Sequence, residues 1–333
     1  MRLYRTHRWV QALQGMGQWA CLGLVLMSTV AQAQTFPPKP IRLIVPFAAG
    51  GSTDIVARMV AEPLGKLLGQ TVVVDNKPGG GGVVGAAELT RAAPDGLTLG
   101  LATASSAATN PAINPKVPYK PLTDFTPIIN MVITPNVLAV HPSFPAKDMT
   151  GFIKVLRAKP GQYDYASSGI GGVAHLQMEL FKTLTQTQVV HIAYSGAGPA
   201  LRDAVGGQVP IIFDNLPSAL PHIKDGRLLA MAVAWPQRVP ELPQVPTFKE
   251  LGLDPVNRPA LYGIWGPKGM SPALVAQLNQ ALRQVLQDPA LVKRIEASGY
   301  KVVANSPAQF AAQLKEEYLV YQKVVDVQKL QLD

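Results

Sequence analysis

The stretch IRLIVPFAAGGSTDIVAR, from Ile41 to Arg58, combines a strand, a glycine loop and the start of a helix. Its first residues, 41–46, are apolar and β-rich, which is typical of a buried strand. Gly50 and Gly51 then let the backbone turn, and apolar residues recur at helical spacing from Ile55. Such a helix start presents unpaired N–H groups at the positive end of the helix dipole, where an anion can bind. A plain βα turn would use the same glycines, and the sequence leaves both interpretations open.

The helix that follows this loop raises two further expectations. Ser52, Thr53 and Asp54 are residue types that cap helix N-termini. We expect Asp54 to cap its own helix, because a carboxylate facing an anionic ligand would repel it. Pro63 lies where the helix should continue, and proline removes a backbone N–H, so we expect a kink or a break there.

Residues 1–33 have the pattern of an export signal. Three arginines lie among the first eight residues, and the apolar run 22–30 is shorter than the ~20 residues that span a bilayer. Ala31-Gln32-Ala33 predicts cleavage after Ala33. The single cysteine, Cys21, lies within this segment, so the mature chain has no disulfide and depends on its core for stability.

The charge distribution argues against a nucleic-acid partner. The formal net charge is +9, and removal of the three signal arginines leaves +6. The remaining Lys and Arg are scattered, without a basic run or interleaved aromatic residues. A mildly positive field would still help to gather anionic ligands.

The strand, glycine loop and helix recur along the chain. Tyr163 to Ser168 is a second strand that runs into Gly169 to Gly172 and then into an apolar helix. Alternating strands and helices predict parallel, doubly wound sheets of the α/β class, in which ligands bind at the carboxyl ends of the strands. Four small-residue loops fit this position and contain no Lys, Arg or His: Phe47 to Asp54, Thr103 to Ser106, Ser167 to Gly172 and Tyr194 to Gly198. Their composition suits a small carboxylate held by backbone N–H and hydroxyl groups.

A dinucleotide fingerprint is also present but is not convincing. Gly80, Gly82 and Gly85 satisfy G-x-G-x-x-G. They follow the second strand rather than the first, and no ribose-binding acid is clearly placed about 20 residues further on. We interpret them as the entry to a helix and expect neither a cofactor nor a metal.

Several ordered motifs resemble the Bug family, the TctC-like solute receptors of tripartite tricarboxylate transporters. The resemblance covers essentially the whole mature chain, and its motifs are Ile44 to Arg58, Val72 to Gly85, Tyr165 to Gly172, His191 to Gly196, Gly206 to Asn215 and Arg238 to Gly252. It implies a type II periplasmic binding protein, with two doubly wound α/β lobes joined by crossing hinge strands. The ligand would bind in the cleft between the lobes, which close over it by a hinge motion.

The resemblance also implies a domain organisation and partners. After the signal peptide 1–33, lobe I would comprise 34–137 and 235–333, and lobe II would comprise 138–234. The crossing strands would fall near Asn136 to Val140 and Ala232 to Trp235. We expect a monomer in the periplasm that is not an enzyme and that delivers a small organic anion to membrane permease subunits.

Carried over by motif, the ligand site has three parts. The residues concerned are Phe47, Ala48, Ala49, Gly50, Gly51, Ser52, Thr53, Thr103 and Ser105 in lobe I, Ser167, Ser168, Gly169, Ile170 and Gly171 in the lobe II loop, and Tyr194, Gly196, Ala197 and Asp214 on the far wall. Asp214 could accept a hydrogen bond from a ligand ammonium or hydroxyl group, or cap the following turn. At Tyr262 the aromatic residues depart from the family pattern, which puts a cleft role for this residue in doubt.

Two other functions remain to be weighed. An exported hydrolase could use a serine of the same cleft, since Ser52, Ser167 and Ser168 are present, but no G-x-S-x-G elbow occurs and we expect His175 to be structural. A receptor that signals to a membrane sensor is the third possibility, and the sequence offers nothing for or against it. The leading prediction is a receptor for a di- or tricarboxylate, an acidic amino acid or an aromatic acid.

Overall fold

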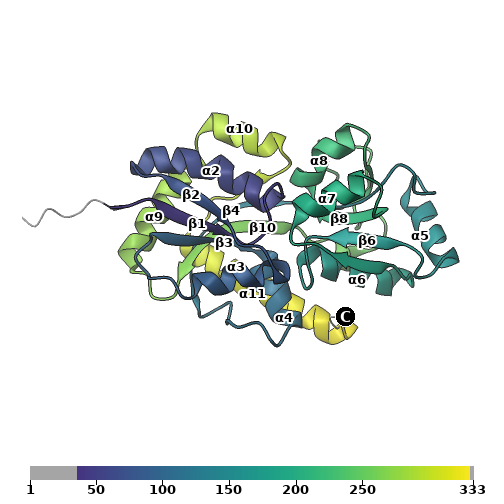
Figure 1. The fold of residues 1–333 in the computed structure, drawn as a ribbon, viewed down its shortest axis with the longest axis horizontal. Helices are drawn as coiled ribbons and strands as arrows, with labels where there is room; N and C mark the ends of the chain where they lie inside the picture. The colour runs from purple at the N-terminus through teal and green to yellow at the C-terminus, as the bar shows by residue number, and fades with distance from the viewer. Residues whose placement is uncertain (1–35, 331–333) are drawn as a thin grey trace, which may run out of the picture. The chain divides into compact units, whose positions relative to one another are not determined.

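The computed structural model describes residues 36–330, whose strands form two separate sheets (Figure 1). The six-stranded sheet has the order β11-β4-β10-β3-β1-β2, and the five-stranded sheet has the order β7-β6-β8-β5-β9. We call each sheet with its helices lobe I and lobe II, respectively. The strands of lobe I are β1 (Ile41–Val45), β2 (Val72–Asn76), β3 (Thr98–Thr103), β4 (Phe125–Thr134), β10 (Ala260–Pro267) and β11 (Lys301–Val302). Those of lobe II are β5 (Asn136–Val140), β6 (Asp164–Ser167), β7 (Val190–Ala193), β8 (Ile211–Asn215) and β9 (Leu229–Ala234).

Both lobes repeat one strand arrangement. In lobe I, β1 pairs in parallel with β2 and β3, and β10 lies antiparallel between β3 and β4. In lobe II, β6 pairs in parallel with β7 and β8, and β5 lies antiparallel between β8 and β9. The antiparallel strand of each lobe is the first strand that the chain forms on arriving from the other lobe.

This arrangement corrects one expectation and confirms another. The sheets are mixed rather than parallel throughout, because β5 and β10 reach their sheets from the other lobe and not through a crossover helix. The two-lobed α/β fold itself is confirmed. The chain changes sheet between Thr134 and Asn136 and again between Ala234 and Ala260, while the lobe boundaries after residues 137 and 234 stay a prediction.

Helices cover both faces of each sheet. Figure 1 shows α2 and α10 on one face of the lobe I sheet and α3 and α11 on the other, while α7 and α8 lie opposite α6 in lobe II. The helices are α2 (Ser52–Leu68), α3 (Val83–Leu89), α4 (Asn110–Ile113), α5 (Met149–Ala158), α6 (Val173–Thr185), α7 (Ala197–Val205), α8 (Leu216–Lys224), α9 (Pro272–Val285), α10 (Pro289–Ala297) and α11 (Pro307–Gln328). Single turns occur at Gly80–Gly82, Ser105–Thr109 (π-helical) and Asp254–Val256.

Helix starts away from the cleft follow the sequence signals closely. Ser271, Asp288 and Ser306 cap α9, α10 and α11, and each accepts a hydrogen bond from a first-turn N–H. Proline occupies the first helical position in all three, where its missing N–H costs nothing. These three helices come from the C-terminal part of the chain and pack in lobe I.

The predicted break at Pro63 is wrong. Helix α2 continues through this residue to Leu68 and ends at Gly69 in the left-handed conformation. Val60, Ala61 and Leu64 are buried on either side of the proline, so tertiary packing holds the helix together despite the lost hydrogen bond.

Replacing this proline therefore tests the energetic account of α2. Pro63→Ala restores an N–H that can bond the carbonyl of Met59, and we expect it to raise the free energy of unfolding by about 1–2 kcal/mol. Urea denaturation of the variant and the wild type measures the change. A lower stability in the variant would contradict the account.

Candidate functional site

One carboxylate holds the lobe I loop between β1 and α2. Asp54, the third residue of α2, is 5% exposed, and its Oδ2 accepts from the N–H of Gly50 at 3.1 Å. The Nε of Arg58 donates to the same carboxylate at 3.0 Å, and the Nδ2 of Asn76 donates to Oδ1 at 3.1 Å. Asn76 also donates to the carbonyl of Phe47 at 3.0 Å. The network thus fixes both ends of the loop.

The expectation that a side chain caps α2 is wrong. Its N-cap is Gly51, with φ −87° and ψ 171°, and no side chain accepts from the first turn. Asp54 reaches back to Gly50 instead of capping its own helix. Within residues 36–330, the N–H groups of Ser52 and Thr53 consequently have no protein acceptor. They stay available to a ligand.

The negative charge of Asp54 is balanced where it lies. Burial would raise the pKa of this carboxyl, but the hydrogen bonds from Arg58, from the N–H of Gly50 and from Asn76 outweigh burial and lower the pKa below 3.8. Asp54 is therefore ionised at neutral pH and paired with Arg58. This pairing explains how a carboxylate can lie beside a loop suited to anions.

The two lobes touch through backbone groups and small side chains. Among the described residues, the hydrogen bonds that join the loops of the two lobes include Ala48 N–H to the Ser195 carbonyl (3.2 Å), Ser52 Oγ to Asn215 Oδ1 (3.0 Å), Thr109 Oγ1 to the Gly171 carbonyl (2.8 Å) and Val173 N–H to Ser105 Oγ (3.1 Å). Gly196 and Gly198 face the lobe I loop so closely that a Cβ on either would collide with Ala48 or Ala49. The cleft in this structure is closed.

A small cavity remains between the closed lobes. Its volume is about 20 Å³, room for about one water molecule. None of the described residues that line it is charged. Seven of the predicted site residues line this cavity: Phe47, Ser52, Thr53, Thr103, Ser105, Ser168 and Ala197.

The other predicted residues lie around the cavity rather than on its wall, in the neighbouring loops or, for Ser167 and Asp214, near the ends of β6 and β8. These are Ala48, Ala49, Gly50, Gly51, Ser167, Gly169, Ile170, Gly171, Tyr194, Gly196 and Asp214. The chain segments around Ala48 and Gly171 form the contact between the lobes. Tyr194 donates its hydroxyl to Asp203 at 2.7 Å and so stabilises α7.

Asp214 lies behind the cavity wall. It is 2% exposed, and its Oδ2 accepts from the hydroxyl of Ser218 in α8 at 2.7 Å. Burial raises its pKa to about 6, although the hydrogen bonds from Ser218 and from the Asn215 N–H oppose the shift. These contacts are those of a residue that fixes the following turn; a direct ligand contact of Asp214 stays a prediction.

Sequence reasoning missed seven residues that line the cavity. They are Ala104, Val173, Ala174, Asn215, Ala260, Leu261 and Tyr262. The doubt about Tyr262 is corrected, since its hydroxyl lies 2.8 Å from Ser52 Oγ at the cavity wall. Burial, the larger cause, raises the pKa of Tyr262, so the phenol is neutral. The sequence signal that could have placed Tyr262 at the cavity was its position in the aromatic-glycine strand pattern of residues 262–265.

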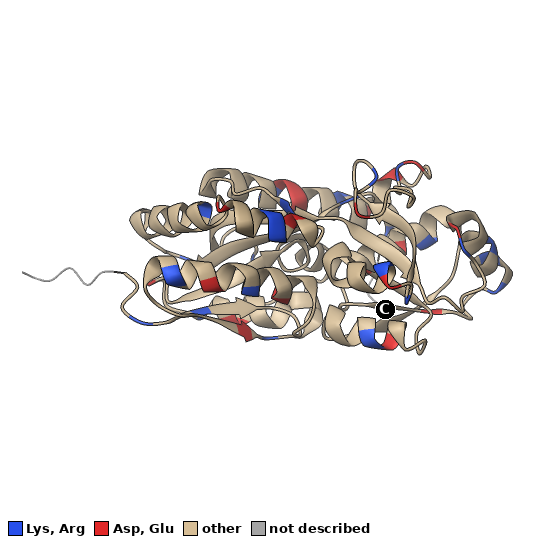
Figure 2. Cartoon of the chain, turned by 90° about the horizontal axis from the view of Figure 1, so that it is seen from above, with Lys and Arg blue, Asp and Glu red and all other residues tan. Residues whose placement is uncertain are grey.

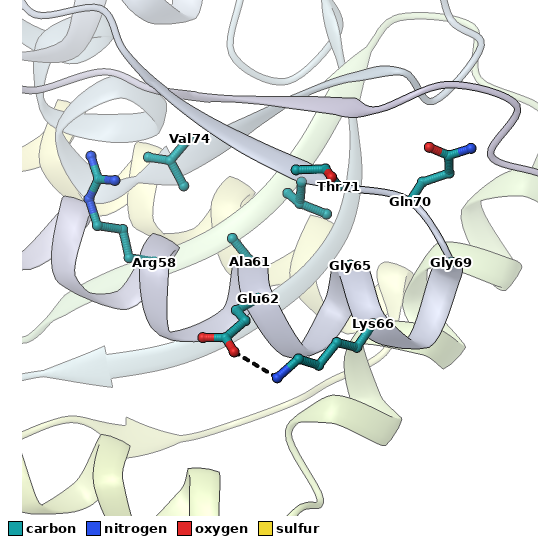
Figure 3. A pocket seen from close by; sticks show the side chains of 10 residues that line it. Arg58, Ala61, Glu62, Gly65, Lys66, Gly69, Gln70, Thr71 and Val74 are labelled. Carbon is teal, nitrogen blue, oxygen red and sulfur yellow. Dashed lines mark hydrogen bonds and ion pairs between the residues drawn. The ribbon is translucent and has the colours of Figure 1, made fainter.

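A larger hollow lies elsewhere in lobe I. It measures about 690 Å³ and is open between α2 and the edge strand β2 (Figure 3). Figure 3 shows Glu62 and Lys66 paired to one another at its rim, with a distance of 2.7 Å. The helix starts and hydroxyl groups described above do not reach this surface, so we place the candidate site in the inter-lobe cavity.

Charged residues are spread over the outer surfaces. Figure 2 shows Lys and Arg interspersed with Asp and Glu along the helices. No helix within residues 36–330 combines the length and the apolar character that crossing a membrane requires. The predicted signal segment 1–33 lies outside the described residues.

The Asp54 network predicts a pH-dependent contribution to stability. A carboxyl whose folded pKa is lowered stabilises the fold above its unfolded pKa of about 3.9 and loses this contribution as the pH falls through the folded value. We therefore expect Asp54→Asn to cost about 1–2 kcal/mol at pH 7, and the difference from wild type to shrink at lower pH. Urea denaturation between pH 7 and pH 3 measures this difference. The exposed Asp326, mutated to Asn, serves as the control and should show no such dependence.

Comparison with known proteins agrees with this geometry. A family model described as the tripartite tricarboxylate transporter family receptor, TctC, matches residues 56–330. The chain is 37% identical over 286 residues to the protein BugT of Bordetella pertussis, covering 86% of this chain and 88% of BugT.

Solved structures lead to the same family. One described as a periplasmic transporter is 49% identical, with a TM-score of 0.87, and the match covers 90% of this chain and 100% of that chain. MatC from Rhodopseudomonas palustris with bound malate is 32% identical, with a TM-score of 0.84, over 87% of this chain and 100% of MatC. The resemblance to Bug and TctC proteins and the two-lobed periplasmic-binding-protein fold are confirmed. The chain belongs to the tripartite tricarboxylate transporter receptor family.

Proposed function

We propose that this protein is a periplasmic receptor that binds a small organic carboxylate between its lobes and delivers it to a membrane permease. The single observation that carries the proposal is the set of helix N-termini around a cavity without charged side chains. The first residues of α2, α6 and α7 all line this cavity. Carboxylates are favoured at such positions because the N–H groups and the helix dipoles both attract negative charge.

The hydroxyl groups would supply the remaining contacts. Ser52, Thr53, Thr103, Ser105 and Ser168 line the cavity and can each donate to a carboxylate oxygen. Asn215 and Tyr262 add an amide and a phenol from the two lobes. A neutral site of this kind selects ligands by the placement of donors and by cleft size, since no side-chain cation lies on its wall.

Ligand entry requires the lobes to separate. A cavity of about 20 Å³ cannot hold a dicarboxylate, so the closed arrangement must open at the crossings between the sheets. On closing over a ligand, the cavity would then be wider than it is here. The inter-lobe hydrogen bonds at Ala48 and Gly171 would re-form to the extent that the ligand allows.

The family membership and one neighbour support the substrate class. MatC carries malate, a dicarboxylate, and shares this fold over 87% of the chain. We extend this class to di- and tricarboxylates, acidic amino acids and aromatic acids. Receptors of this family belong to a three-component transporter, so a monomer in the periplasm that serves permease subunits is the proposed setting.

Calorimetric titration tests the proposal. The protein is unfolded and refolded to remove carried ligand, and then titrated with malate, succinate, adipate, citrate, glutamate and nicotinate. We expect saturable one-site binding of at least one acid, because the donors converge on the one cavity between the lobes. Absence of binding across this set in folded protein would overturn the carboxylate assignment.

One contact favours a second candidate, the exported hydrolase. The Oγ of Ser167 lies 2.7 Å from Nε2 of His191, a spacing that a nucleophile and its base share. Ser167 is 1% exposed, does not line the cavity, and also accepts from the N–H of Gly169 at 3.2 Å. These features favour a structural hydrogen bond. Turnover of p-nitrophenyl acetate that is lost in Ser167→Ala would favour the hydrolase instead.

Lobe closure makes a sharper prediction about Gly171. A Cβ at this position would overlap the Asn110 side chain of lobe I, and its φ of +71° already disfavours other residues. Gly171→Ala should therefore weaken binding of the best ligand from the calorimetric screen by at least about tenfold.

Gly161 provides the matched control for Gly171→Ala. It lies in lobe II with φ +70°, and nothing lies near a Cβ added to it. Gly161→Ala should cost a similar ~1–2 kcal/mol of stability from backbone strain while leaving affinity unchanged. Equal losses of affinity in the two variants would argue that strain, and not closure, weakens binding.

A further inference from the structure

The two ligand loops enter their helices in the same way. In lobe I the N-cap Gly51 has φ −87° and ψ 171°, and Gly50 before it has φ +83°. In lobe II the N-cap Gly172 has φ −71° and ψ 169°, and Gly171 before it has φ +71°. Both N-caps follow the strand of their sheet that has a parallel neighbour on each side, β1 in lobe I and β6 in lobe II.

The third helical residue accepts from the N–H before the N-cap in both lobes. Gly50 donates to the carboxylate of Asp54 at 3.1 Å, and Gly171 donates to Nδ1 of His175 at 3.0 Å. His175 is 1% exposed. Its imidazole occupies the place that a carboxylate takes in lobe I.

A residue on the edge strand β2 or β7 then holds that acceptor in each lobe. Asn76, on β2, donates to Asp54 and to the carbonyl of Phe47 at the start of the loop. His191, on β7, stacks on His175 with ring centroids 4.1 Å apart and 17° between the planes. Its Nε2 lies 2.7 Å from Oγ of Ser167, the last residue of β6.

The surroundings keep His191 neutral. Burial, the largest cause, and the nearby charge of Lys182 lower the pKa of His191 to about 3. Glu179 lies 3.8 Å from Nε2 of His175 but is bound by Lys182 at 2.7 Å, and Tyr165 stacks on the other face of His191 with centroids 4.7 Å apart. Nδ1 of His175 can accept from Gly171 only when the proton is on Nε2.

We propose that His175 and His191 are positioning residues for ligand binding, the lobe II counterparts of Asp54 and Asn76. They fix the loop 167–172, whose Gly171 carbonyl accepts from Thr109 at 2.8 Å. Two residues further on, the N–H of Val173 donates to Oγ of Ser105 at 3.1 Å. If the histidines no longer held this loop, the two inter-lobe hydrogen bonds from Thr109 and from Val173 would be lost or distorted. The proposal rests on the proposed function, since it concerns binding in the same cleft.

Substitutions at His175 separate positioning from packing. Asn places its Oδ1 where Nδ1 lies, so His175→Asn keeps an acceptor for Gly171, whereas His175→Leu removes it. With malate as the probe, we expect His175→Leu to weaken binding about tenfold and His175→Asn to stay within about threefold of wild type. If Asn and Leu weaken binding equally, the acceptor has no positioning role and the proposal is overturned.

A control variant separates loss of stability from loss of positioning. Met178 is buried on the same helix and belongs to the lobe II core. Met178→Ala should lower the melting temperature at least as much as His175→Leu does, yet leave the malate affinity unchanged. A loss of affinity in Met178→Ala equal to that of His175→Leu would overturn the proposal, because lobe II stability alone would then explain the effect.

A ligand-free measurement distinguishes this proposal from the proposed function. In protein labelled with ¹⁵N-histidine at pH 7.5, the Nδ1 resonance of His175 should have the shift of an unprotonated acceptor and the Nε2 resonance that of a protonated nitrogen. A proton on Nδ1 would overturn the inference whether or not any acid binds. If wild type binds neither malate nor the other acids while this tautomer is present, the carboxylate function fails and the loop geometry stands.

Discussion

The hydrogen bond from the N–H that precedes the glycine N-caps of α2 and α6 is the constraint on which the cleft depends. Because Asp54 and His175 accept that N–H from within their own helices, the loops are held without a capping side chain at Gly51 or Gly172. Helices α5, α9, α10 and α11 are built differently, with Ser or Asp side chains that accept the first-turn N–H groups, as at Ser271. A glycine N-cap therefore leaves N–H groups for a ligand where a serine would consume them.

Because the strand order repeats, this loop and helix start occur in both lobes. Each lobe presents the end of β1 or β6, a loop with a left-handed glycine, and a helix start, and the chain enters the two sheets through the antiparallel strands β5 and β10. The sites differ in one respect. The lobe I acceptor is a carboxylate that needs Arg58 to balance its charge, whereas the lobe II acceptor is the Nδ1 of a buried imidazole. In both lobes the N–H groups and hydroxyls are therefore the groups that would attract the proposed ligand.

Local signals predicted most of the fold and half of the cavity wall. A strand followed by a glycine loop, like a Ser-Pro or Asp-Pro helix start, depends only on residues that are neighbours in the sequence. Such local patterns located the loops after β1, β3 and β6. Tyr262 and Asn215 could not be placed this way, since Tyr262 reaches Ser52 across 210 residues of sequence and only the antiparallel β10 brings it there. The predictions at Pro63 and Asp54 were wrong because tertiary contacts decide both positions. Packing keeps α2 continuous through Pro63, and Asp54 accepts from the N–H of Gly50 instead of capping its helix.

A crystal structure of the protein grown with malate, or with the best ligand from the calorimetric screen, tests the central claim most directly. The account predicts one carboxylate within hydrogen-bonding distance of the N–H groups of Ser52 and Thr53. It also predicts that Gly50 and Gly171 remain bonded to Asp54 and His175. An acid bound in the hollow between α2 and β2, or loops that abandon these two hydrogen bonds when the cleft is occupied, would contradict it.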